Sequence, residues 1–158
     1  MRSKNDQTVR NIIVDGLQEQ ARHLAQVLFE KKIENLWIID VSALCAYADF
    51  LILGDAENER HMQAALDALD KATSRPGFGI SPEKGGRWTL LDLGDIVVDL
   101  FLPGVREIYR LEDLYSDAVI YALDEAGVER QIMPDERMSL YPVSQRSSDT
   151  KLTEFRAP

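Results

Sequence analysis

Cysteine and histidine are nearly absent from this chain of 158 residues. The single cysteine, Cys45, excludes an internal disulfide and suits a reducing cytosol. It lies outside any nucleophile motif, so a small, half-buried residue is its expected role. The two histidines, His23 and His61, are too few for a structural zinc site, which needs about four ligands. We therefore expect neither a metal nor another cofactor.

Long apolar runs and positive charge are also scarce. No run of about 18 apolar residues is present, so the sequence predicts no transmembrane helix. The first residues, MRSKNDQTVRN, lack the apolar core of a signal peptide, and we expect a cytoplasmic protein. With 18 basic against 27 acidic residues, the net charge is −9. Free nucleic acid is not an expected ligand, because it is bound by basic groups, whereas a basic protein partner fits.

The apolar periodicity predicts three helices. Apolar residues recur at spacings of three and four from Thr8 to about Lys32. The same spacing follows Asn58, a suitable helix cap, as far as about Ala72. A third helical pattern covers residues 111–125, with Gly127 as its stop.

Short apolar runs predict the strands. They cover residues 35–42, 50–53, 87–92 and 96–102, with a short edge strand at 78–80. Leu93-Gly94-Asp95 carries a hairpin turn signal. Together the elements predict an α/β fold, with a mixed β-sheet of about five strands flanked by helices, in one domain over residues 1–127. Residues 128–158 contain three prolines and little periodicity, and we expect an extended or disordered tail.

Two carboxylates in GDIVVDLF are the most enzyme-like feature. On one strand Asp95 and Asp99 would share a face but lie about 13 Å apart, too far to share one metal ion. Asp40, on another strand, is the third carboxylate that a nucleotidyltransferase-like, metal-dependent enzyme would use. The more common interpretation is that they are strand-end or solvent-exposed carboxylates. The Gly-rich loop PGFGISPEKGG lacks the spacing of a phosphate-binding loop. We expect no catalytic residues, and the enzyme is the alternative hypothesis.

Strand alternation makes Trp88 a candidate binding residue. It places Trp88, Leu90 and Asp92 on one face of the 87–92 strand. A large aromatic that shares a face with a carboxylate near a hairpin tip is a suitable anchor for a protein interface. A place in the core is the alternative, since large aromatics are highly buried on average.

Several motifs in a fixed order resemble one protein family. They are EKKIENLWIIDVS, a D-F strand, ERH, GRWTLLDLGD, FLPGVREIY and LEDL, spread over about residues 17–118. Together they resemble the ribosomal silencing factor family, also called the Iojap-like family. The resemblance implies a small α/β fold related to that of nucleotidyltransferases, with no demonstrated need for their chemistry.

The resemblance also implies a partner and a role. Family members bind the large ribosomal subunit through its ribosomal protein uL14, block joining of the small subunit and lower translation. They are also associated with large-subunit assembly and often form homodimers. Carried onto this chain, the partner-binding surface falls on Trp88, Leu90, Asp92, Asp95, Arg106 and Tyr109. A dimeric assembly adaptor with a secondary ribosome contact is a third hypothesis.

Three stretches depart from the family pattern. Residues 55–58, Asp-Ala-Glu-Asn, replace a Thr-Gly-Thr-Ser-like stretch, and Glu57 would repel a phosphate. Asn58 still suits a helix cap. Asp99 stands where histidine is common, and the tail after Gly127 exceeds the family core. Nucleotide transfer is therefore less expected.

Overall fold

One mixed sheet organises the computed structural model, which describes residues 4–73, 77–83, 85–133 and 136, without the side chains of residues 4–15 and 78. Within these residues seven strands lie in the order β3-β4-β5-β2-β1-β6-β7. The strands are β1 (Glu34–Asp40), β2 (Phe50–Asp55), β3 (Phe78–Ile80), β4 (Trp88–Asp92), β5 (Ile96–Phe101), β6 (Val119–Leu123) and β7 (Glu129–Ile132). The helices are α1 (Lys4–Glu30), α2 (Glu59–Ala72) and the short α3 (Val105–Tyr109), followed by a 3₁₀ helix, η1 (Leu111–Tyr115).

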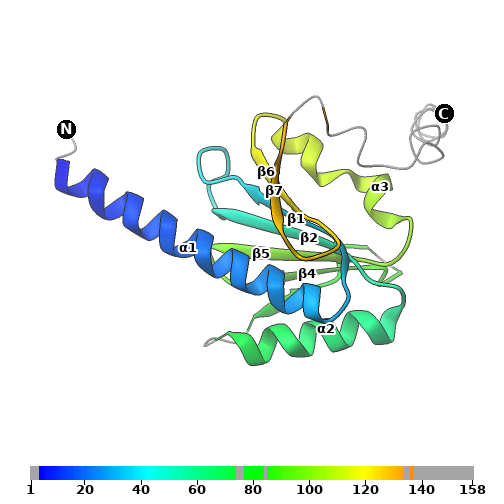
Figure 1. Cartoon of the computed structure of the whole chain (residues 1–158). Helices are drawn as coiled ribbons and strands as arrows, with labels where there is room; N and C mark the ends of the chain where they lie inside the picture. Colours follow the sequence, from blue (N-terminus) through cyan, green and yellow to red (C-terminus); the bar gives the residue numbers. More distant parts are fainter. Residues whose placement is uncertain (1–3, 74–76, 84, 134–135, 137–158) are drawn as a thin grey trace.

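The centre of the sheet is its parallel part. β2 and β5 pair in parallel, and every other pair of neighbours in the described sheet is antiparallel. β5 is buried along its whole length, as expected for a strand covered on both faces. α1 and α2 pack on one face, and α3, η1 and the 41–48 loop cover the other (Figure 1). No helix among the described residues has the length and apolar character needed to cross a bilayer.

The prediction of a helix over residues 111–125 is wrong. Residues 111–115 form η1, and residues 119–123 form β6, which pairs with β1 on one side and β7 on the other. Residues 119–123 form a continuous apolar run, which fits a buried strand as well as a helix, so pairing with distant strands decides the outcome.

The sheet is also larger than expected. It has seven strands in the described residues instead of about five, and the two additional strands are β6 and β7. The domain boundary predicted at residue 127 falls inside the hairpin that joins them. Residues 134–135 and 137–158 of the predicted tail lie outside the described residues.

The predicted helix cap and hairpin turn are both confirmed. The Asn58 side chain accepts a hydrogen bond from the His61 N–H at 2.8 Å, at the start of α2. Gly94 has a φ of 94°, in the left-handed region that favours glycine. The Asp92 carboxylate accepts a hydrogen bond from the Gly94 N–H at 2.8 Å. Asp92 therefore helps to shape the turn between β4 and β5.

His61 connects the facing ends of α1 and α2. Its Nδ1 accepts a hydrogen bond from the Glu57 N–H at 3.0 Å, so Nε2 carries the proton and donates to the Lys31 carbonyl at 2.6 Å. Removing both bonds with His61→Ala should lower the free energy of unfolding by about 1–3 kcal/mol, as measured by urea unfolding. His23→Ala, on the exposed surface of α1, is the control and should leave the midpoint unchanged. Equal midpoints for the two variants would rule out this structural role for His61.

Candidate docking face

Trp88 opens β4 and lies partly in the core and partly at the surface. Its ring packs on Phe101, its cross-strand partner, with centroids 5.3 Å apart, and on Tyr109 with centroids 4.9 Å apart. Trp88 is half-buried, whereas Tyr109 is 39% exposed. The sequence left open whether Trp88 lies in the core or at the surface. Its side chain does both, because one part packs on Phe101 and another part stays exposed.

The buried side chain of Asp99 binds the indole of Trp88. The Trp88 Nε1–H donates to the Asp99 carboxylate at 2.9 Å. Asp99 is 1% exposed, and this burial raises its pKa to about 6, although the Trp88 hydrogen bond and the charge of Arg106 lower it. The prediction of a strand-end or solvent-exposed carboxylate is thus wrong for Asp99. Its neighbours in register are Leu90 and Leu53, so it lies at the centre of the sheet.

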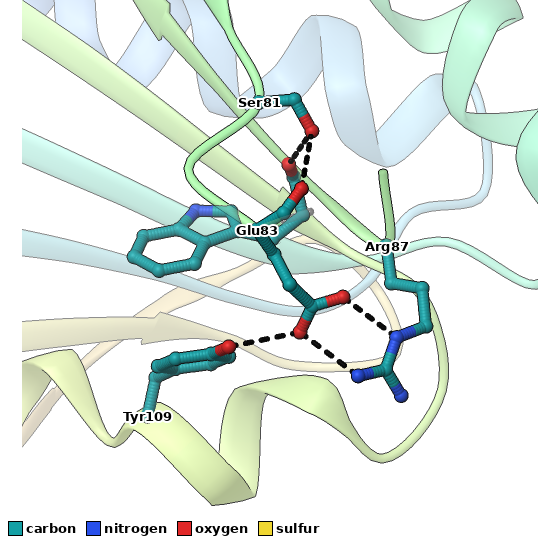
Figure 2. Close-up of polar contacts among 5 residues, drawn as sticks. Ser81, Glu83, Arg87 and Tyr109 are labelled. Atoms are coloured by element: carbon teal, nitrogen blue, oxygen red, sulfur yellow. Dashed lines mark hydrogen bonds and ion pairs between the residues drawn. The ribbon is translucent and has the colours of Figure 1, made fainter. Parts of the chain in front are cut away.

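A second set of hydrogen bonds holds Tyr109 (Figure 2). The Tyr109 hydroxyl donates to the Glu83 carboxylate at 2.9 Å, and Arg87 donates to the same carboxylate from Nε at 2.6 Å and from Nη2 at 3.0 Å. These bonds, those from Arg87 first, lower the pKa of Glu83. Ser81 Oγ lies 3.2 Å from the carbonyl oxygens of Glu83 and Trp88, which ties the preceding loop to β4. Both aromatic rings are therefore held before any partner arrives, which limits the entropy lost on binding.

Five of the six predicted binding residues lie on or beside β4, in what we call the docking face. Its members are Trp88, Leu90, Asp92, Asp95 and Tyr109. Leu90 is half-buried on the same face of β4 as Trp88, and Asp92 and Asp95 are exposed at the β4–β5 turn, about 13 Å from Trp88. Ile80, the partner of Leu90 on β3, is 45% exposed and enlarges the apolar part. The sequence predicted the β3 edge strand, but the apolar role of Ile80 was missed.

Arg106, the sixth predicted residue, lies inside the protein. It is 2% exposed, its guanidinium carbon lies 4.1 Å from the centroid of the Trp37 ring, and its Nη1 donates to the Asn35 carbonyl. The same Nη1 is 3.7 Å from the Asp55 carboxylate. These contacts direct the Arg106 side chain inwards from α3. Arg106 is therefore removed from the predicted binding surface. Arg106 anchors the helix that carries Tyr109.

The carboxylates of the enzyme hypothesis occupy three unrelated settings. Asp40 accepts hydrogen bonds from the Ser42 N–H at 3.1 Å and the Ser42 hydroxyl at 2.6 Å. Asp95 is exposed in a turn, and Asp99 is buried beside Trp88. Among the described residues, no three His, Cys, Asp or Glu side chains form a group that could hold a metal ion.

Comparison with known sequences gives consistent matches. A family model described as "Ribosomal silencing factor during starvation" matches residues 14–152. The chain is 31% identical over 110 residues to "Ribosomal silencing factor RsfS" of Halalkalibacterium halodurans, covering 68% of this chain and 94% of that protein. It is 34% identical over 101 residues to "Protein Iojap, chloroplastic" of Arabidopsis thaliana, covering 63% of this chain and 42% of that protein.

Solved structures of similar proteins share the fold. A crystal structure of a Chromobacterium violaceum protein matches with a TM-score of 0.55 at 27% identity, covering 62% of this chain and 84% of that one. A Bacillus halodurans structure matches with a TM-score of 0.52 at 25% identity, covering 61% and 93%. The family model spans the sheet and the whole docking face, and so the chain belongs to the ribosomal silencing factor family.

Proposed function

We propose that this protein binds the large ribosomal subunit at uL14 through the docking face, blocks joining of the small subunit and represses translation without catalysing a reaction. The observation that carries the proposal is the Trp88–Tyr109 pair, partly exposed and held in place on a protein of net charge −9. Interfaces draw most of their affinity from such aromatic anchors, and charges at the rim select a partner of opposite charge. Asp92 and Asp95 supply that rim.

The names of relatives support further parts of the proposal. A mouse relative, 28% identical over 99 residues and covering 59% of this chain and 43% of that protein, is named "Mitochondrial assembly of ribosomal large subunit protein 1". We therefore include a role in large-subunit assembly. Bacterial relatives named ribosomal silencing factors favour a cytoplasmic location, and the family resemblance favours a homodimer.

Sedimentation with isolated ribosomal subunits tests the proposal. We expect the pure protein to co-sediment with large subunits and to reduce the formation of whole ribosomes when small subunits are added. The sedimentation of the protein alone reports whether it is a dimer. Folded protein that stays free of large subunits and leaves subunit joining unchanged would contradict the proposal.

A further inference from the structure

A groove is lined by residues from the end of α1, the start of β1 and the turn between β6 and β7. Its volume is about 670 Å³, and ligand sites typically measure about 300–1,000 Å³. Phe29, Leu36 and Leu123 form an apolar floor, and all three pack in the core between the sheet and α1. We call this feature the acidic groove, because of the rim described next.

The rim of the groove carries more negative than positive charge. Glu34, Asp124 and Glu125 line it together with one cation, Lys32. The Asp124 carboxylate is used within its own turn, where it accepts hydrogen bonds from two backbone N–H groups at 2.9 Å each. Glu34 and Glu125 are exposed and are the carboxylates that a partner can reach.

A smaller pocket extends the groove towards α3. It has a volume of about 190 Å³, shares Glu34 with the groove and is also lined by Asp55, Glu57 and Glu107. Glu107 belongs to α3, the helix that carries Tyr109, and one of its carboxylate oxygens is buried without a hydrogen-bond partner. Asp55 is paired with Arg106, so Glu57 and Glu107 are the carboxylates that continue the negative charge from the groove to α3.

The strand register places the groove and the aromatic pair at the same end of the sheet. Glu34 of β1 pairs with Asp55 of β2, Asp55 pairs with Phe101 of β5, and Phe101 pairs with Trp88 of β4. Three strand spacings separate Glu34 from Trp88, or about 14 Å. The apolar floor of the groove packs on the α1 face of the sheet and Trp88 on the opposite face. A partner therefore reaches both by covering this end of the sheet, which an interface of about 800 Å² per partner allows.

We propose that the acidic groove receives a basic segment of the same large-subunit partner, with an apolar side chain on the floor and Lys or Arg side chains beside Glu34 and Glu125. This inference rests on the proposed function, because it extends the binding of that partner beyond the docking face. A phosphate backbone would be repelled by the rim, so a protein segment is favoured over RNA. The apolar floor and the volume favour a peptide over a small cation.

Charge reversal in the groove tests the inference. The double variant Glu34→Lys/Glu125→Lys should bind isolated large subunits at least about tenfold more weakly at low salt, with a shallower dependence of affinity on salt. Titration of labelled protein into large subunits at two salt concentrations measures both quantities. The neutral pair Glu34→Gln/Glu125→Gln should fall between the wild type and the reversed variant.

A matched control separates the groove from the overall charge. Asp67→Lys/Asp70→Lys changes two exposed carboxylates on α2, outside the groove, and gives the same net charge of −5 in place of −9. The control should bind as the wild type does. Wild-type affinity in the groove variant, or an equal loss in the control, would overturn the inference and leave the proposed function standing. Failure of the wild type to bind large subunits would instead overturn the proposed function.

Discussion

Replacing Trp88 with alanine should lower the affinity for large ribosomal subunits at least about thirtyfold, since an anchor at the centre of an interface contributes about 2 kcal/mol or more. The loss of affinity should be larger than the loss of the contacts that Trp88 itself makes with the partner. The reason is that Tyr109 packs on Trp88 and is no longer held in place in the variant. Titration against large subunits measures the affinity, and urea unfolding checks that the variant is folded under the same conditions.

Conservative variants separate the anchor from its supports. Trp88→Phe keeps an aromatic ring next to Phe101 and Tyr109 but loses the hydrogen bond to Asp99 and part of the ring area, so it should bind between the wild type and the alanine variant. Tyr109→Phe keeps its ring and loses the bond to Glu83, with a smaller expected effect. If folded Trp88→Ala protein binds as tightly as the wild type, Trp88 is not part of the interface.

Replacing Asp99 with asparagine should stabilise the protein at neutral pH and leave its stability nearly unchanged in acid. The pKa of Asp99 is about 6 in the folded protein, compared with an ordinary value of 3.8. Between these values the folded state binds more protons than the unfolded chain, so the stability of the wild type falls as the pH rises through this window and is level above it. Two pKa units correspond to about 3 kcal/mol, which is the upper bound of the effect.

Urea unfolding at pH 4 and pH 7 measures the difference between the two proteins. Asparagine keeps an acceptor for the Trp88 Nε1–H and does not ionise, so the variant should gain up to about 3 kcal/mol over the wild type at pH 7 and little at pH 4. Burial also raises the pKa of Glu112, but that contribution is present in both proteins and cancels. Asp95→Asn, in the exposed turn, is the control. A variant less stable than the wild type at pH 7 would show that the charge of Asp99 is needed, with Arg106 as its partner.

The correctly predicted elements carry signals that act over a few residues. Asn58 caps α2 through a bond to the third residue after it, and Gly94 takes the left-handed φ that the β4–β5 turn requires. The 119–123 strand was missed because its apolar residues also fit a helix. The contacts that decide its structure come from β1, far away in the chain. Local propensity is overridden there by pairing.

For the site as well, features set by local sequence were predicted and features set by distant contacts were not. Alternation along one strand correctly grouped Trp88 and Leu90, because the period of a strand is a local property. The burial of Asp99 and Arg106 was not foreseen, since charged residues are mostly exposed. Asp99 of β5 contacts Trp88 of β4, and Arg106 of α3 contacts Trp37 of β1. Each charge is therefore covered by a ring from a different element. The partner was inferred from the family resemblance, and no spacing of residues would have indicated it.

The docking face and the acidic groove differ in how their residues are spread along the chain. From Glu83 to Tyr109, one continuous segment supplies the aromatic pair and the bonds that hold it. The groove instead needs the β6–β7 hairpin held against α1, which depends on an exposed pair between Arg22 and Glu129 and a bond from Gln26 to Gly127. Contacts that are exposed or only partly buried open by local unfolding at far lower free energy than the core. A molecule opened there keeps its aromatic anchors and loses its acidic contact, so binding weakens in steps and does not vanish at once.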